Sequence, residues 1–139
     1  MKKKIFLACL VALMSTTSVY SYTGECNGGS IVKSTTGATF CMSNKYLNWW
    51  SAQAWCQVNG SQIATIYEMC PNWNGNTGSG TCPELKNVAG NYKFLWSATV
   101  SGTDNMFAVH AISGEVTNTY TKNLASGYNG YVEMYAFCR

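Results

Sequence analysis

Long apolar stretches are missing from this 139-residue chain after its first twenty residues, and charged residues are scarce, at 11%. A helix that crosses a bilayer needs about 20 consecutive apolar residues, so we expect no membrane span downstream. Basic clusters outside the N-terminus are also missing, and binding to nucleic acid or anionic lipid depends on them. The composition therefore predicts a soluble chain that does not bind nucleic acid.

Residue types that build metal and catalytic centres are equally rare. The chain has one histidine, His110, and no Cys-x-x-Cys pair, whereas zinc sites need closely spaced Cys and His ligands. Residues 71–83 are rich in Asn and Gly but hold no carboxylate, and a calcium site needs several. His110 has no cysteine or serine nucleophile directly beside it in the sequence. We expect no metal, no cofactor and no catalytic residue.

The N-terminus has the pattern of a secretory signal peptide. Residues 2–4 are lysines, residues 5–14 form an apolar core, and Val19 and Ser21 suit the positions before a cleavage site. An apolar core of this length is too short to span a bilayer. We expect residues 1–21 to be removed and the protein to be exported to the periplasm, the cell surface or the medium.

Cleavage before Tyr22 leaves a length typical of one domain, with six basic and six acidic side chains. A domain of this size buries only about two-thirds of its unfolded surface, so covalent cross-links would help to stabilise it. Without Cys9 it has six cysteines, and an even number in an exported chain indicates three disulfides. The cysteine pattern by itself leaves the pairing open, and a metal site is the alternative use.

Residues 49–68 predict two short helices joined by a tight link. Ser51 is the expected N-cap of the first helix, because a serine hydroxyl can accept a hydrogen bond from a first-turn amide. Gly60 suits the left-handed residue that ends it. Thr65 and Glu68 have the spacing of a capping box, which starts a second helix and explains Glu68 without catalysis. The apolar residues of the first helix recur at i, i+3 and i+4: Ala52, Trp55 and Cys56.

The remaining segments have the alternation of β-strands. Residues 30–33 and 38–42 flank a Thr-Thr-Gly turn and predict a hairpin. The last strand, at 131–138, places every second residue on one face: Val132, Met134, Ala136 and Cys138. Further strands are expected at 94–100, 106–112 and 115–121. Two helices followed by a compact antiparallel sheet predict a single α+β domain over residues 22–139.

Residues 49–68 also carry a resemblance. Their pattern W-x-S-A-x-x-W-C…G-x-Q-I-A-T-x-x-E resembles the segment W-x-D-A-x-x-Y-C…G-x-R-L-P-T-x-x-E of formylglycine-generating-enzyme-like (sulfatase-modifying) domains, in the bacterial branch of the C-type lectin-like fold. Downstream, L-W-S-A-T at 95–99, Gly114 and F-C-R at 137–139 resemble the ending of those domains. The resemblance covers residues 26–139. This chain departs from the pattern at Ser51, Gln62 and Ala64, where the family has Asp, Arg and Pro.

The resemblance implies both a fold and a disulfide pairing. C-type lectin-like domains join a first-helix cysteine to the last strand, which implies Cys56–Cys138. Cys26 and Cys41 then flank the predicted hairpin, and Cys70 and Cys82 close a local loop. The Glu-Pro-Asn and Trp-Asn-Asp strings of calcium-dependent lectins do not occur here. The related enzymes bind copper with a pair of cysteines late in the chain, where this sequence has only Cys138. The resemblance thus implies a calcium-independent, non-catalytic member.

Aromatic residues in polar loops are the candidate binding residues. Tyrosine among small polar residues is typical of adaptable binding loops, and aromatic faces stack on sugars. In this fold the loops remote from the termini form one face, which here would include 71–83 and 117–130. The latter tract also resembles those that diversity-generating systems produce on this fold. The predicted ligand-binding residues are Trp73, Tyr120, Tyr128, Asn118 and Asn129. The alternative is that Trp73 only covers the core.

We therefore expect an exported, disulfide-linked domain that binds a glycan or a protein surface. One alternative is an enzyme related to the formylglycine-generating oxidases. The other is a structural component of the cell envelope.

Overall fold

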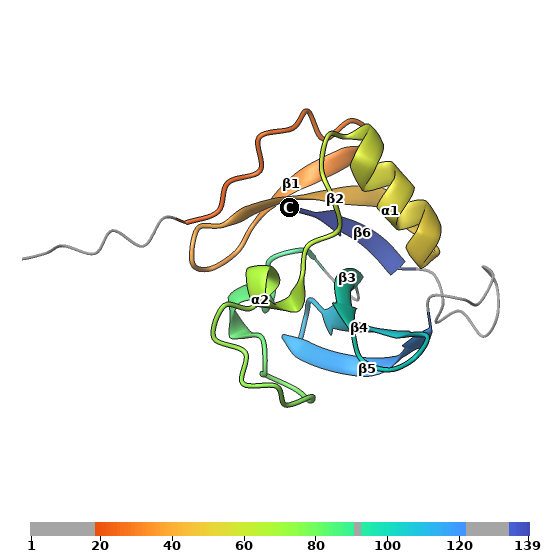
Figure 1. Ribbon diagram of the computed structural model, residues 1–139. Coiled ribbons are helices and arrows are strands. Elements are labelled where there is room, and N and C mark those ends of the chain that lie inside the picture. Colours follow the sequence, from red (N-terminus) through yellow and green to blue (C-terminus); the bar gives the residue numbers. More distant parts are fainter. Residues whose placement is uncertain (1–18, 91–92, 122–133) are drawn as a thin grey trace, which may run out of the picture.

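The computed structural model of the chain describes residues 19–90, 93–121 and 134–139. The described strands form one six-stranded sheet in the order β1-β2-β6-β3-β4-β5, and α1 and α2 lie on different sides of it (Figure 1). The elements are β1 (Gly29–Lys33), β2 (Thr39–Leu47), α1 (Trp49–Val58), α2 (Ile66–Met69), the 3₁₀ turn η1 (Pro83–Leu85), β3 (Phe94–Val100), β4 (Asn105–His110), β5 (Glu115–Thr121) and β6 (Met134–Cys138). The predicted α+β class is confirmed.

The sheet is mixed, which corrects the expected all-antiparallel arrangement. β6 runs antiparallel to β2 but parallel to β3, where Leu95 pairs with Tyr135. The other neighbouring strands are antiparallel. The last strand lies between β2 and β3 and not at an edge of the sheet. Its direction relative to these two neighbours is set by the route that the chain takes from β5 to β6. Residue alternation within a strand carries no information about that path.

β6 is buried on both faces and separates two cores. Met134, Ala136 and Cys138 are at most 1% exposed and pack below α1, as their alternation predicts. Phe137 points the other way and stacks on Phe40, with ring centroids 4.6 Å apart. This second core lies between the sheet and the segment that contains α2 and η1. β6 is therefore the central strand of the fold.

Both helix starts are capped by side chains, but one cap differs from the prediction. The Asn48 side chain accepts a hydrogen bond from the Ser51 backbone N–H at 2.8 Å, so Asn48 is the N-cap of α1 and Ser51 lies inside the helix. Asparagine satisfies the first-turn amides as well as serine does. The predicted capping box of α2 is present: Thr65 and Glu68 each accept from the other's backbone N–H. Gly60 has the expected positive φ, at 76°.

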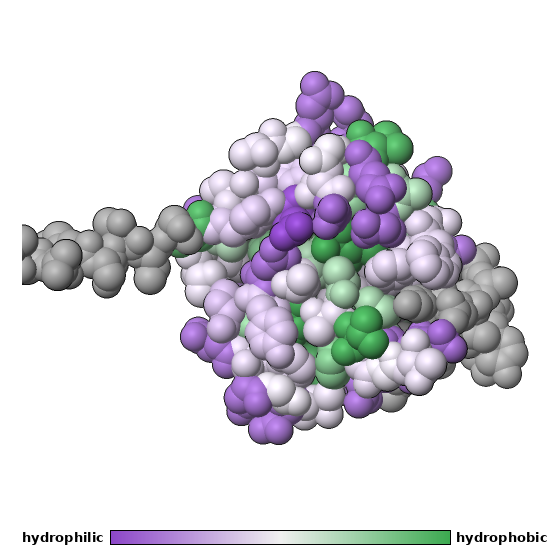
Figure 2. Space-filling model, in the orientation of Figure 1, coloured by the Kyte–Doolittle hydropathy of each residue, from purple (hydrophilic) through white to green (hydrophobic). Residues whose placement is uncertain are grey.

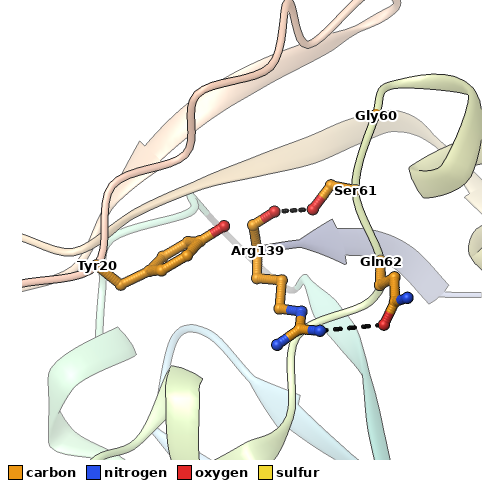
Figure 3. A pocket seen from close by; sticks show the side chains of 5 residues that line it. All are labelled: Tyr20, Gly60, Ser61, Gln62 and Arg139. Atoms are coloured by element: carbon orange, nitrogen blue, oxygen red, sulfur yellow. Dashed lines mark hydrogen bonds between the residues drawn. The ribbon is translucent and has the colours of Figure 1, made fainter.

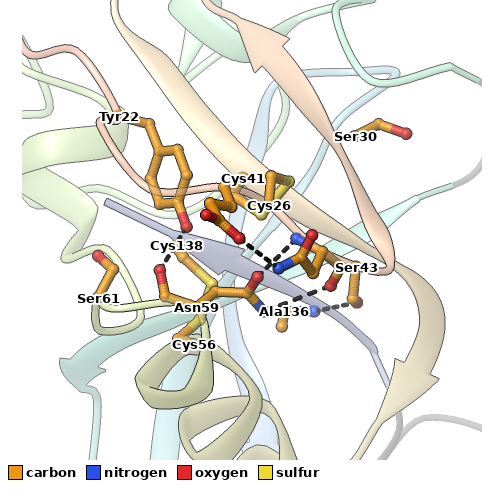
Figure 4. The surroundings of a disulfide bond; sticks show 12 residues. Tyr22, Cys26, Ser30, Cys41, Ser43, Cys56, Asn59, Ser61, Ala136 and Cys138 are labelled. Carbon is orange, nitrogen blue, oxygen red and sulfur yellow. Dashed lines mark hydrogen bonds between the residues drawn. A yellow bond between two sulfur atoms is a disulfide. The ribbon is translucent and has the colours of Figure 1, made fainter.

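The three implied disulfides are present, and two of them lie side by side. Cys56 of α1 bonds Cys138 of β6, next to the Cys26–Cys41 bond, because Cys41 and Cys138 are paired in the sheet (Figure 4). The Tyr22 hydroxyl donates to the Asn59 carbonyl near them. The third bond joins Cys70 to Cys82. The N-terminal segment, α1 and the final strand are thus tied together at one end of the sheet.

The predicted long polar loop between α2 and β3 is a packed segment. It contains η1 and contributes Leu85 to the second core. Glu84 is 3% exposed, and its carboxylate accepts from the Asn72 side chain at 3.2 Å. Within the described ranges, no helix is long and apolar enough to cross a membrane.

Candidate functional site

Trp73, the first predicted anchor, is a core residue. Its side chain is 8% exposed, and its ring lies 4.9 Å from that of Phe107 and 5.6 Å from that of Tyr67. Its Nε1 donates to the Asn76 carbonyl at 2.6 Å, which satisfies the one polar atom of the indole. This is the alternative that the sequence analysis left open. A ring held in this way offers little surface to a ligand.

The other predicted binding residues lie on or near β5. Asn118 is exposed, and its backbone carbonyl accepts from the Ser101 hydroxyl at 3.4 Å. Tyr120 pairs with Met106 of β4 through its backbone. Tyr128 and Asn129 lie outside the described residues. Among the described residues, the 71–83 segment contacts the start of β5, where the Gly78 N–H donates to the Val116 carbonyl at 2.9 Å, one residue before the 117–130 tract.

A different group of aromatic residues is accessible at the rim of the second core. We call Tyr46, Tyr135 and Lys93 the aromatic cluster. The rings of Tyr46 and Tyr135 are tilted by 44° with centroids 4.4 Å apart, and Tyr46 is 50% exposed. The Lys93 ammonium nitrogen lies 4.9 Å from the centroid of the Tyr135 ring. Tyr46 comes from β2 and Tyr135 from β6, while Lys93 directly precedes β3. The three side chains form a common surface.

A bulge in β2 brings the two tyrosines together. Met42 pairs with Phe137 and Tyr46 with Tyr135, so three residues of β2 face one of β6 between these pairs. Regular pairing would have placed Asn44 opposite Tyr135. The Ser43 hydroxyl holds the bulge, since it accepts from the Ala136 N–H at 2.9 Å and donates to the Lys45 carbonyl at 2.8 Å. Bulges of this kind commonly redirect a side chain at a functional surface.

The surroundings of Tyr135 favour its neutral form. Burial raises the pKa of Tyr135 above its ordinary value, and the side-chain hydrogen bond with Tyr46 raises it further. A lysine ammonium near an aromatic face is attracted by the ring quadrupole. The surface therefore combines aromatic faces, phenol hydroxyls and an N–H donor, which are the groups that bind sugars and polar protein surfaces.

Sequence reasoning missed this cluster because it placed binding residues in loops. Tyr46 and Tyr135 belong to strands, and Tyr135 lies on the face of β6 that the alternation pattern assigns away from Met134 and Cys138. A tyrosine on that face was a usable signal. Its partner could not be found by pattern, because the bulge changes which β2 residue lies opposite it.

The sole histidine has a serine near it in space. The His110 Nδ1 and the Ser113 hydroxyl are 3.0 Å apart across the turn that joins β4 to β5, and the His110 ring stacks on Phe94. The two residues are three positions apart in a tight turn, so a local turn contact accounts for the pair. Among the described residues, no group of three or more His, Cys, Asp or Glu side chains is arranged to hold a metal ion.

Comparison with models of protein families finds none that matches this chain, and comparison with curated proteins finds no matching relative.

Proposed function

We propose that the chain is an exported, calcium-independent ligand-binding domain of the C-type lectin-like fold, which recognises a glycan or a protein surface and performs no chemistry. The observation that carries this proposal is the aromatic cluster. It offers one half-exposed tyrosine and a second ring behind it, both held by strands of the sheet, and a lysine directly before β3. Binding groups on strands are positioned more rigidly than groups on loops.

The cluster also lies close in the sequence to two of the predicted binding residues. Tyr135 is the second residue of β6. The predicted binding residues Tyr128 and Asn129 lie between β5 and β6 in the sequence. We propose that they act together with Tyr46.

The disulfide pattern supports the proposed fold. Cys56–Cys138 joins the first helix to the last strand, as the resemblance implies, and the capping box that carries part of the family pattern is formed. The three disulfides also agree with export, since such bonds persist in oxidising compartments.

A screen of the exported protein on glycan and protein arrays, with and without EDTA, tests this proposal. We expect a ligand whose binding EDTA leaves unchanged. Tyr46→Ala and Tyr128→Ala should each weaken binding at least tenfold, because truncating an aromatic anchor typically costs about 2 kcal/mol or more. Tyr67→Ala is the matched control, since Tyr67 is 59% exposed and lies in α2, and His110→Ala should also bind normally.

Two results would contradict the proposal. One is equal loss of binding in Tyr67→Ala, which would place the ligand elsewhere. The other is binding that EDTA abolishes, which would mean that a metal takes part. A protein that binds nothing on either array and does not consume oxygen with thiols would support the structural-component alternative instead.

A further inference from the structure

Residues 19–22 are built into the domain although the predicted cleavage site lies within them. The Thr39 N–H donates to the Tyr20 carbonyl at 3.1 Å, and the Tyr22 N–H donates to the Thr39 carbonyl, also at 3.1 Å. The segment is therefore hydrogen-bonded to the start of β2. The Tyr20 ring lies 5.8 Å from the ring of Phe40, a residue of the second core that is fully buried.

Tyr20 also stands between two clefts of about 350 Å³ each. The first is polar and is drawn in Figure 3, where the Tyr20 ring extends toward Arg139 and Ser61. Its lining residues are Tyr20, Gly60, Ser61, Gln62 and Arg139. The second is mostly apolar and is lined by Val19, Tyr20, Thr36, Ala38, Tyr67, Glu68 and Pro71. Tyr20 lines both clefts, so removal of Val19 and Tyr20 would open both; we call this opened surface the groove.

Side chains fixed by the fold would form the floor of this groove. The Arg139 guanidinium bonds Glu68 at 2.7 Å and the Gln62 side chain at 3.1 Å. The Ser61 hydroxyl donates to the Arg139 carbonyl. Figure 2 shows the most hydrophilic residues of this face where Figure 1 marks the C-terminus, with apolar residues scattered around them. The groove would thus have a polar centre and an apolar wall.

We propose that, in the chain that begins at Tyr22, this groove binds an extended segment of a partner polypeptide that carries an aromatic side chain. The chain's own Val19–Ser21 segment shows how such a ligand would lie. Its carbonyl would accept from the Thr39 N–H, and its ring would cover Phe40. Addition of an extended segment to a strand is a common mode of peptide recognition, in which backbone bonds give affinity and a side-chain pocket gives specificity.

The physical reason for binding is the surface that cleavage would leave. A partly buried backbone N–H needs a hydrogen-bond acceptor, and cleavage would remove the Tyr20 carbonyl that accepts from the Thr39 N–H. Phe40 would lose the ring that covers one side of it. A second copy of the processed chain would also lack Val19 and Tyr20, so it could not fill the groove with the segment that fills it here.

The experiment uses the protein that cells export from the full-length gene. Intact-mass measurement first establishes its N-terminus, which we expect at Tyr22. A fluorescent peptide with the sequence Thr-Thr-Ser-Val-Tyr-Ser, taken from residues 16–21, is then titrated and followed by anisotropy. We expect saturable binding, at least tenfold weaker binding when the peptide tyrosine is replaced by alanine, and a rise in melting temperature on adding the peptide.

Substitutions in the protein test whether the peptide binds in the groove. Thr36→Arg should weaken binding at least tenfold, because Thr36 is exposed at the groove and a long side chain would fill it. Val58→Arg is the control, since Val58 is 86% exposed on α1 and lines neither cleft. A chain exported behind a leader that is cut before Ser18 keeps its own segment and should not bind the peptide.

Three results would overturn the proposal. The first is an exported protein that retains Tyr20, because the groove would then be filled by the chain itself. The second is absence of saturable binding at millimolar peptide, or equal binding of the tyrosine and alanine peptides. The third is self-association of the processed chain that Thr36→Arg abolishes, which would make a second copy the occupant.

Discussion

At the scale of single residues, Trp73 shows how strongly burial depends on neighbours that are distant in sequence. It lies in a segment of Asn, Gly and Pro, yet it packs against Phe107 of β4 and the Tyr67 ring of α2. The Cys70–Cys82 bond closes the segment in which Trp73 lies. An indole that is buried with its N–H satisfied contributes to stability in the same way as any core side chain.

We predict that Trp73→Ala lowers the free energy of unfolding by about 3–5 kcal/mol, the usual cost of truncating a buried tryptophan. Trp73→Phe keeps one aromatic ring but loses part of the indole and the hydrogen bond to the Asn76 carbonyl, and should cost about 1–2 kcal/mol. Urea denaturation measures both. If Trp73→Ala is as stable as the parent but binds the ligand tenfold more weakly, Trp73 is an anchor after all.

At the scale of elements, the bulge in β2 connects the fold to the proposed site. Ser43 is 1% exposed, and its hydroxyl satisfies a buried N–H of the neighbouring strand while it turns the chain of β2. The same residues decide that Tyr46, and not Asn44, faces Tyr135. A buried serine in a strand thus positions a proposed binding residue three positions further along.

Removal of this hydroxyl should affect both stability and binding. We predict that Ser43→Ala costs about 1–3 kcal/mol, because the Ala136 N–H is left buried without its partner. Ligand affinity should fall by more than the loss of folded protein explains, since Tyr46 loses its fixed position. Ser30→Ala in β1 is the control: its hydroxyl is exposed, so the change should stay within about 0.5 kcal/mol. Equal effects of the two substitutions would contradict this role for Ser43.

At the scale of the whole molecule, one disulfide connects elements that are distant along the chain. Cys56–Cys138 spans 82 residues and joins α1 to the central strand, whereas the other two bonds span 15 and 12 residues. In the chain-entropy account, a disulfide that closes a longer loop restricts the unfolded chain more. The bond between α1 and β6 is therefore expected to contribute most.

We predict that the double substitution Cys56→Ala with Cys138→Ala lowers the free energy of unfolding by about 4–5 kcal/mol. The matched pair Cys70→Ala with Cys82→Ala, which opens a short loop, should cost about 3 kcal/mol or less. Denaturation of both variants under oxidising conditions measures the difference. A larger loss from opening the short loop would show that packing around Trp73, and not chain entropy, controls the stability.

The amino-acid sequence by itself determined the local features. The capping box, the hairpin, the strands 94–100 and 115–121 and the left-handed Gly60 follow from residues within a few positions of one another. Family resemblance added the disulfide pairing. These features could be predicted because caps, turns and alternation depend on interactions between near neighbours.

Tertiary structure decided the rest. The direction of β6, the burial of Trp73, the bulge that brings Tyr46 to Tyr135 and the pairing of Tyr20 with Thr39 all join residues far apart in the sequence. Such contacts depend on the path of the whole chain, and any one strand or loop would satisfy its local preferences equally well with another partner. Both proposed binding sites arise from contacts of this second kind.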